Sequence, residues 1–251
     1  MALYRVEGIV LKTRELGEAD KIVTLYCRDQ GKVRAVARGS RRPRNRLSSG
    51  TQLFTYGEFL LSEGKNLDAI SQAEIRESFR GLREDLARMA YASYVMELTG
   101  EMVEAKEPNE PLFLLLLGVL HLLGEDDPGN HETIVRFFEL KLLTLLGYRP
   151  HLRNCVSCSN PEVSFFSPAL GGMVCRRCRE QVPGATEVVK VAPGTVQAMR
   201  KLDESRFHGA RAVKPGATIN REMEFVTRTY ITYLLEKPLK SWAFLDMVRA
   251  N

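Results

Sequence analysis

Short apolar and β-branched segments follow one another closely over the first 75 residues, with no helical period between them. The pattern predicts five strands, at residues 6–11, 21–27, 32–37, 52–61 and 67–75. In the third strand, Val33 and Ala35 share one face and Arg34 lies on the other, as expected for a strand with one buried side. Five short strands indicate a small barrel. The five-stranded OB-fold is the leading candidate, and an SH3-like barrel fits the pattern nearly as well.

After Ile75 the apolar residues recur three and four positions apart, which is the spacing of helices. This spacing predicts helices at residues 82–103, 112–123, 132–146, 193–206, 220–236 and 239–248. Pro111 suits the first turn of the second helix, and Gly147 suits the end of the third. We therefore predict an α+β protein in which an OB-fold barrel domain, residues 1–78, precedes a helical domain, residues 79–251.

Two close pairs of cysteines interrupt the helices. Cys155 and Cys158 form the first pair, Cys175 and Cys178 the second, and 16 residues separate the pairs. Each pair can fold into a tight turn that presents two thiolates to one tetrahedral ion, and a loop of this length lets the second pair complete the site. The spacing predicts one structural Zn²⁺ in a module at about residues 150–182. An iron–sulfur cluster and a redox dithiol pair are the alternatives.

The net charge of +5 comes entirely from the N-terminal third of the chain. Residues 1–80 hold 15 Lys or Arg against 10 Asp or Glu, whereas the remaining residues hold 21 of each. Within this third, residues 28–46 carry eight basic side chains and one acidic side chain. A run of charge this one-sided suggests a polyanionic partner, since guanidinium groups suit phosphate oxygens.

No base-reading motif accompanies the basic residues, so we expect nucleic-acid binding that is independent of sequence. The candidate contacts are Lys12, Arg14, Lys32, Arg34, Arg38, Arg41, Arg42, Arg44 and Arg46. The first two are expected in the loop after the first strand, a usual ligand contact in OB-folds, and the last four in a flexible loop after the third. A solvated loop without a partner is the alternative.

Two further groups of side chains allow two interpretations each. Aromatic residues of the barrel either fill the core or stack on bases: Tyr26, Phe54, Tyr56 and Phe59. Basic residues near the cysteines either balance thiolate charge or add a second nucleic-acid contact: Arg149, His151, Arg153, Arg176, Arg177 and Arg179.

Other features narrow the class of protein. Arg5 and Glu7 interrupt the apolar N-terminus, which shows no cleavage site of a secretory leader. The longest apolar run, residues 112–123, spans 12 residues and is too short for a membrane helix. Phosphate-binding, dinucleotide-binding and nucleophile-elbow motifs are absent, and residues 131–135 begin like HExxH but end in Val. We expect a cytoplasmic, nucleoid-associated protein that is not an enzyme and has no membrane partner.

Four stretches of sequence form a specific combination. They are residues 8–12 (GIVLK), 17–25 (GEADKIVTL), 31–39 (GKVRAVARG) and 137–148 (FFELKLLTLLGY), the last of which leads into the cysteine pairs. Residues 166–168 (FSP) and 171–172 (GG) lie between the pairs. Together these stretches resemble the RecO family of bacterial DNA repair and recombination mediators, in the expected order and over essentially the full length.

The resemblance implies an N-terminal OB-fold and a helical domain with a zinc module. It also implies binding of single- and double-stranded DNA, annealing of complementary strands, and loading of the RecA recombinase together with RecR. The loading occurs on strands coated by single-stranded-DNA-binding protein (SSB), whose C-terminal tail docks on the helical domain. The resemblance assigns Lys32, Arg34 and Arg38 to the family's strand and residues 41–46 to its basic loop. Some members lack the cysteines, which implies that the metal is dispensable for the shared activity.

A function of a different class is the alternative. The chain would then be a zinc-dependent nucleic-acid enzyme or a sequence-specific zinc-containing regulator. Either function requires an open coordination position on the metal or a helix that reads bases.

Overall fold

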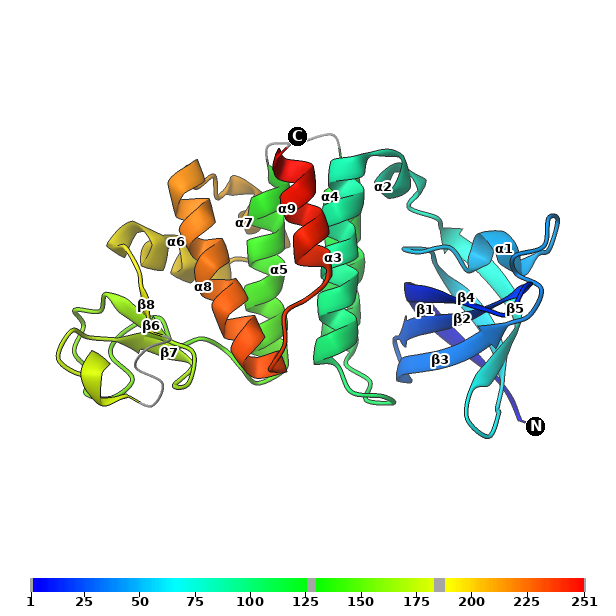
Figure 1. Cartoon of the computed structure of the whole chain (residues 1–251), viewed down its shortest axis with the longest axis horizontal. Helices are drawn as coiled ribbons and strands as arrows, with labels where there is room; N and C mark the ends of the chain where they lie inside the picture. Colours follow the sequence, from blue (N-terminus) through cyan, green and yellow to red (C-terminus); the bar gives the residue numbers. More distant parts are fainter. Residues whose placement is uncertain (1, 126–129, 183–187, 251) are drawn as a thin grey trace. The chain divides into compact units, whose positions relative to one another are not determined.

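Five strands close into a barrel within the described residues of this computed structural model, which are 2–125, 130–182 and 188–250 (Figure 1). The strands are β1 (Leu3–Leu16), β2 (Asp20–Cys27), β3 (Gly31–Ala37), β4 (Tyr56–Ser62) and β5 (Asp68–Glu77). Their order is β1-β2-β3-β5-β4, and all neighbours are antiparallel except β3 and β5, which pair in parallel. This order is that of an OB-fold, so the predicted barrel is confirmed.

The alternation of side chains along the strands builds the barrel core. In β3, Val33, Ala35 and Ala37 are buried, whereas Arg34 is exposed. Cys27 shares this interior, and burial raises the pKa of its thiol to about 12, so it is a neutral core residue. The other core side chains are apolar: Val6, Val10, Val23, Leu25, Leu47, Phe59, Leu61 and Ile70.

Two strand boundaries differ from the prediction. β1 continues to Leu16 instead of ending at Leu11, so Lys12 and Arg14 lie on a strand and not in a loop. A bulge at this point shifts the register of β1 against β2, and backbone pairing then carries β1 onward although its side chains are polar. β4 begins later than predicted because Phe54 has a φ of 73°, a left-handed conformation that a strand excludes.

The barrel belongs to a compact unit formed by Met1–Glu125 and Lys240–Asn251. Its helices are α1 (Leu47–Gly50), α2 (Arg80–Glu84), α3 (Leu86–Met102), α4 (Glu110–Gly124) and α9 (Ser241–Ala250). α3 packs against α2, α4, α9 and β1. The single helix predicted at 82–103 is divided at Asp85, whose extended backbone ends α2. The Asp85 carboxylate then accepts a hydrogen bond from the Arg88 N–H (2.8 Å) as the N-cap of α3.

Two charged side chains hold α3 within this unit. Lys32 of β3 donates from its ammonium group to the carbonyls of Gly100 (2.7 Å) and Val103 (2.6 Å) at the C-terminal end of α3. Glu97 of α3 accepts hydrogen bonds from two backbone N–H groups at the start of α9, at 3.1 and 2.7 Å. A cation at a helix C-terminus and a carboxylate at a helix N-terminus both complement the helix dipole, so both contacts are favourable.

The second compact unit, Asp126–Leu239, is built around a buried helix. Its helices are α5 (His131–Leu145), α6 (Pro193–Glu204), α7 (Phe207–Ala212) and α8 (Ala217–Leu235). α5 packs against the other three and is buried on most sides, as predicted, and Gly147 follows it with a φ of 85°. The buried Arg136 is compensated by Glu139 (3.2 Å) and by the Thr227 hydroxyl (3.1 Å).

A small sheet lies between α5 and α6 in the sequence. Its strands are β6 (Phe165–Ser167), β7 (Gly172–Val174) and β8 (Val189–Lys190), in the order β7-β6-β8, and a 3-10 turn covers Arg179–Gln181. The sequence pattern does not predict these strands because segments of two or three residues are too short to show an alternation. None of the helices in the part of the chain that the structure describes has the length and apolar character that crossing a membrane requires.

A half-buried carboxylate joins several elements of the barrel unit. Glu7 of β1 accepts hydrogen bonds from Tyr56 of β4, from Arg28 (3.3 Å) and from Arg76 of β5 (3.2 Å), and Arg28 also pairs with Glu110 of α4 (2.9 Å). Burial raises the pKa of Glu7, but the hydrogen bonds from Tyr56 and Arg28 and the charge of Arg76 outweigh burial. The pKa therefore lies below its ordinary value.

We expect the Glu7→Gln variant to lower the free energy of unfolding by about 1–2 kcal/mol at pH 7. Because the folded pKa is lowered, the charged carboxylate stabilises the native state above the ordinary pKa of 4.5, and this contribution is lost as pH falls through the folded pKa. Urea unfolding at pH 7 and below pH 4 measures the difference. Glu74→Gln, at an exposed position of β5, is the matched control. A loss of equal size at both pH values would contradict the prediction.

Candidate nucleic-acid interface and metal site

Three strands place two of the predicted cations in one row on the outer face of the barrel. Lys12 of β1 lies opposite Thr24 of β2, and Thr24 lies opposite Arg34 of β3. Residues directly opposite each other in a sheet share a face, so Lys12 and Arg34 flank Thr24 on the same side. Both cations are exposed, and neither forms an ion pair with another residue that the structure describes. Arg14 follows along β1 and is also exposed.

The loop after β3 continues this basic surface. Its four arginines are exposed: Arg41, Arg42, Arg44 and Arg46. The loop is anchored at its start, where the backbone N–H of Gly39 donates to the Asp20 carboxylate (2.7 Å). Arg41 pairs with Glu15 (3.1 Å), whereas the other three make no ion pair within the described ranges. The loop therefore offers at least three charges to a polyanion.

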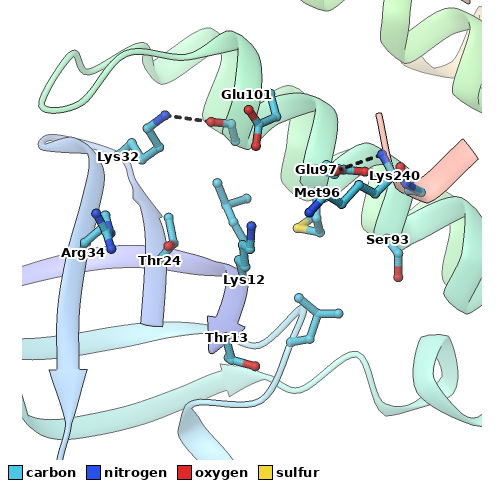
Figure 2. Close-up of a pocket in the computed structure, with 14 residues that line it drawn as sticks. Lys12, Thr13, Thr24, Lys32, Arg34, Ser93, Met96, Glu97, Glu101 and Lys240 are labelled. Carbon is cyan, nitrogen blue, oxygen red and sulfur yellow. Dashed lines mark hydrogen bonds between the residues drawn. The ribbon is translucent and has the colours of Figure 1, made fainter. Parts of the chain in front are cut away.

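Arg38 and Lys32, the remaining predicted contacts, differ in their surroundings. Arg38 is exposed directly after β3. The ammonium group of Lys32 is turned towards α3 and bound to its two terminal carbonyls (Figure 2). Lys32 thus has a structural role in addition to the one predicted for it.

The aromatic residues of the barrel contribute mainly to its packing. Tyr26, Phe54 and Phe59 are buried, at 0–1% exposure, so their rings have no face free for a base. Tyr26 packs against Phe113 of α4, with ring centres 6.3 Å apart. Tyr56 is half-buried, and its hydroxyl donates to Glu7. The interpretation of the first three as core residues is confirmed.

One cation of this face could not have been found from the sequence. Lys240, at the start of α9, lines the same hollow as Lys12 and Arg34, a cavity of about 440 Å³ (Figure 2). More than 200 residues separate it from these two. Only the packing of α9 on α3 brings it here, and no pattern of charge or hydropathy indicates that packing.

The four paired cysteines come together as predicted. Their Sγ atoms all lie within 4.8 Å of one another, and those of Cys158 and Cys175 are 3.6 Å apart. Sulfurs around a tetrahedral ion with bonds of about 2.3 Å are separated by roughly 3.8 Å, so the spacing suits one ion. It is too long for a disulfide bond of about 2.05 Å. An iron–sulfur cluster would divide the four cysteines among two or four irons, which separates the sulfurs on different irons further. The site can hold one metal ion such as zinc.

Backbone geometry prepares the thiols for a metal. Tight turns follow Cys155 and Cys175, whose carbonyls accept hydrogen bonds from Ser159 (2.8 Å) and Arg179 (3.1 Å). Burial raises the pKa of Cys155, but three backbone hydrogen bonds, that of Cys175 first, outweigh burial and lower it to about 6. A backbone hydrogen bond from Cys178 lowers the pKa of Cys175. Because the thiolate is the metal-binding form, these backbone hydrogen bonds favour binding through Cys155 and Cys175 at neutral pH. The side-chain hydrogen bond with Cys158 and burial instead raise the pKa of Cys178 to about 12.

Most basic residues near the cysteines are engaged within their own compact unit. Arg149 and Arg153 form ion pairs with acidic residues of α6, at 2.7 and 3.2 Å. Arg177 hydrogen-bonds to the thiol sulfurs, which raises its pKa, and the Arg179 guanidinium lies 4.6 Å from the centre of the Phe165 ring. These contacts favour a role in balancing local charge over a second nucleic-acid surface.

Comparisons with known proteins agree on one family. The model described as Recombination protein O N terminal matches residues 1–79, and the model described as Recombination protein O C terminal matches residues 83–243. The DNA repair protein RecO of Symbiobacterium thermophilum is 44% identical over 255 residues, which cover 100% of this chain and 99% of the relative. The DNA repair protein RecO of Pelotomaculum thermopropionicum is 42% identical over 98% of this chain and 94% of its own length.

We expect the Cys155→Ser/Cys175→Ser double variant to lose its bound metal and the order of residues 150–182, because thiolates supply all four ligands and the surrounding apolar cluster is small. Limited proteolysis should then cut within this segment at protease concentrations that leave the barrel intact, and metal analysis should show no bound ion. Ser157→Ala, at an exposed position between the first two cysteines, is the control. A double variant that lost only DNA binding and kept the segment protected would contradict a structural role.

Proposed function

The chain belongs to the RecO family of DNA repair proteins, and on this premise we propose that it is a mediator of DNA repair and recombination that binds single- and double-stranded DNA without sequence preference. The contacts are the basic residues of β1, β3 and the following loop: Lys12, Arg14, Lys32, Arg34, Arg38, Arg41, Arg42, Arg44 and Arg46. The carrying observation is the row formed by Lys12 and Arg34 on the outer face of the barrel, which the exposed loop arginines extend.

The chemistry of this surface favours the sugar–phosphate backbone over the bases. Arginine and lysine side chains neutralise phosphates and release counterions, which gives affinity to any sequence. Specific readout requires an element that enters a groove and places side chains against base edges, and no such base-reading motif accompanies these cations. The protein should therefore bind unrelated DNA sequences about equally.

Annealing follows from the same charge neutralisation. Two complementary strands repel each other through their phosphates, and a cationic surface that binds both lowers this repulsion until base pairs form. We further propose that the protein works with RecR to load RecA onto strands coated by SSB, and that the C-terminal tail of SSB docks on the helical domain, residues 79–251. The proposal of these partners rests on the membership of the chain in the RecO family. The place of action would be the nucleoid in the cytoplasm.

The metal, which we propose to be zinc, would have a structural function. Cys155, Cys158, Cys175 and Cys178 supply four thiolate ligands, and a tetrahedral ion bound to four protein ligands has no position for water or substrate. The ion would hold the two cysteine turns together and so fix the small sheet between them. This ligand set supports a mediator without catalytic activity over a zinc-dependent enzyme.

We expect charge reversal in the Arg38→Glu/Arg42→Glu variant to weaken binding of unrelated duplexes equally, by at least about tenfold near physiological salt. For wild type with about six phosphate contacts, log affinity should fall with log salt at a slope of roughly −5, and the variant should lose about two units of slope. Fluorescence anisotropy over a salt series measures both.

Lys190→Glu/Arg221→Glu, which changes the net charge equally at exposed positions of the second unit, is the matched control. A loss of affinity that is equal in both double variants would sink the assignment of the surface to the barrel. Failure of wild type to bind or anneal DNA would sink the proposed function itself.

A further inference from the structure

The cavity of about 440 Å³ beside the basic row has three walls within one compact unit (Figure 2). The outer face of the barrel contributes Lys12, Thr24 and Arg34, α3 contributes Ser93 and Met96, and the start of α9 contributes Lys240. Its volume falls in the range of about 300–1,000 Å³ that is usual for sites of small molecules.

The two charged contacts of α3 join the elements that form the walls of this cavity. The Lys32 ammonium binds the last carbonyls of α3 to the barrel, and the Glu97 carboxylate binds the first amides of α9 to α3. The side chains of Lys32 and Glu97 both line the cavity. The barrel, α3 and α9 are thus fixed to one another on either side of the hollow. A preformed hollow spares a ligand the cost of opening it.

The lining combines three kinds of chemistry. Leu11 and Met96 are buried, at 3% and 1% exposure, and give it an apolar floor. Hydroxyl groups of Thr24 and Ser93 can donate or accept hydrogen bonds within it. Exposed cations stand at its rim: Lys12, Arg34 and Lys240. An apolar floor with hydroxyls matches a nucleobase, and cations at the rim match the phosphates on either side of it.

We propose that this hollow accepts one unpaired base of a DNA single strand, while Lys12, Arg34 and Lys240 hold the adjacent phosphates. The inference rests on the proposed function, because the basic row on which the proposed DNA binding depends forms one wall of the hollow. A base that is paired and stacked in a duplex cannot enter, so the hollow adds affinity for single strands alone. A row of cations alone would not distinguish single strands from duplexes in this way, because both forms of DNA present phosphates.

The two carboxylates of the lining disfavour an acidic side chain inside the hollow but do not affect an uncharged base. Glu97 and Glu101 of α3 both line the hollow. A peptide rich in carboxylates would bring like charges towards these two side chains, which is unfavourable at short distance. A nucleobase enters without charge and leaves its phosphates outside, next to the cations.

The test fills the hollow without changing the charge. Ser93→Phe, with a ring directed into the space, should weaken binding of a single-stranded oligonucleotide about 5- to 30-fold, because the base loses its apolar contacts and its hydrogen bonds in the hollow. Binding of a duplex and its salt dependence should not change. An oligonucleotide that carries 2-aminopurine should change its fluorescence on binding wild type and not on binding the variant. Ser71→Phe, at an exposed position of β5, is the matched control and should bind both forms of DNA as wild type does.

A smaller filling variant at the same position, Ser93→Leu, replaces the first if thermal unfolding shows that Ser93→Phe does not fold. Unchanged single-strand affinity in a folded filling variant would overturn the proposal. So would an equal loss for single strands and duplexes. If an acidic, phenylalanine-containing peptide bound wild type and not the filling variant, while single-strand affinity stayed unchanged, the hollow would belong to a protein partner. The duplex arm keeps this test separate from the proposed function, which fails only if DNA binding itself is absent.

Discussion

Closure of the barrel is the constraint on which the arrangement of its charges depends. Apolar side chains fill the interior of this closed sheet of five strands. Because successive residues of a strand point to opposite faces, every second residue points outwards. In β3 this alternation buries Val33 and Ala35 and exposes Arg34. The register with β2 and β1 then aligns Arg34 with Lys12. A basic row on the outer surface is therefore a consequence of the same pattern that fills the core.

The outer face of the barrel carries more than the proposed nucleic-acid surface, because α3 packs against part of it. Lys32 lies two residues before Arg34, on the same face of β3, and its side chain binds the end of α3. Glu97 of α3 in turn binds the start of α9. Both side chains also line the hollow between the barrel, α3 and α9, and the cations of the hollow continue the row on the barrel.

The cysteine module meets a different physical requirement. Its strands are only two or three residues long, and the apolar cluster around them is small. Sheets of this size are not stable by themselves, and four ligands to one ion, as proposed, would supply the missing stability. The arginines around the module form ion pairs, contact sulfur or pack on an aromatic ring. Its construction is that of a structural element, whereas the barrel presents exposed cations, Lys12 and Arg34, that form no ion pair with the residues that the structure describes.

The sequence by itself determined the local elements and the candidate metal ligands. Alternation in residues 32–37 predicts β3 and its exposed side, and the spacing of Cys155, Cys158, Cys175 and Cys178 predicts their convergence, because both depend on neighbours in the chain. Sequence patterns did not reveal the extension of β1 to Leu16, the division of the helix at Asp85, or the small sheet. In each of these places backbone hydrogen bonding or a cap overrode the side-chain pattern. The tertiary structure alone decided that Lys32 binds α3 and that Lys240 joins Lys12 and Arg34. Contacts between residues so far apart in the chain depend on how the helices pack. The spacing of apolar residues predicts which face of a helix is buried, but it does not predict which element covers that face.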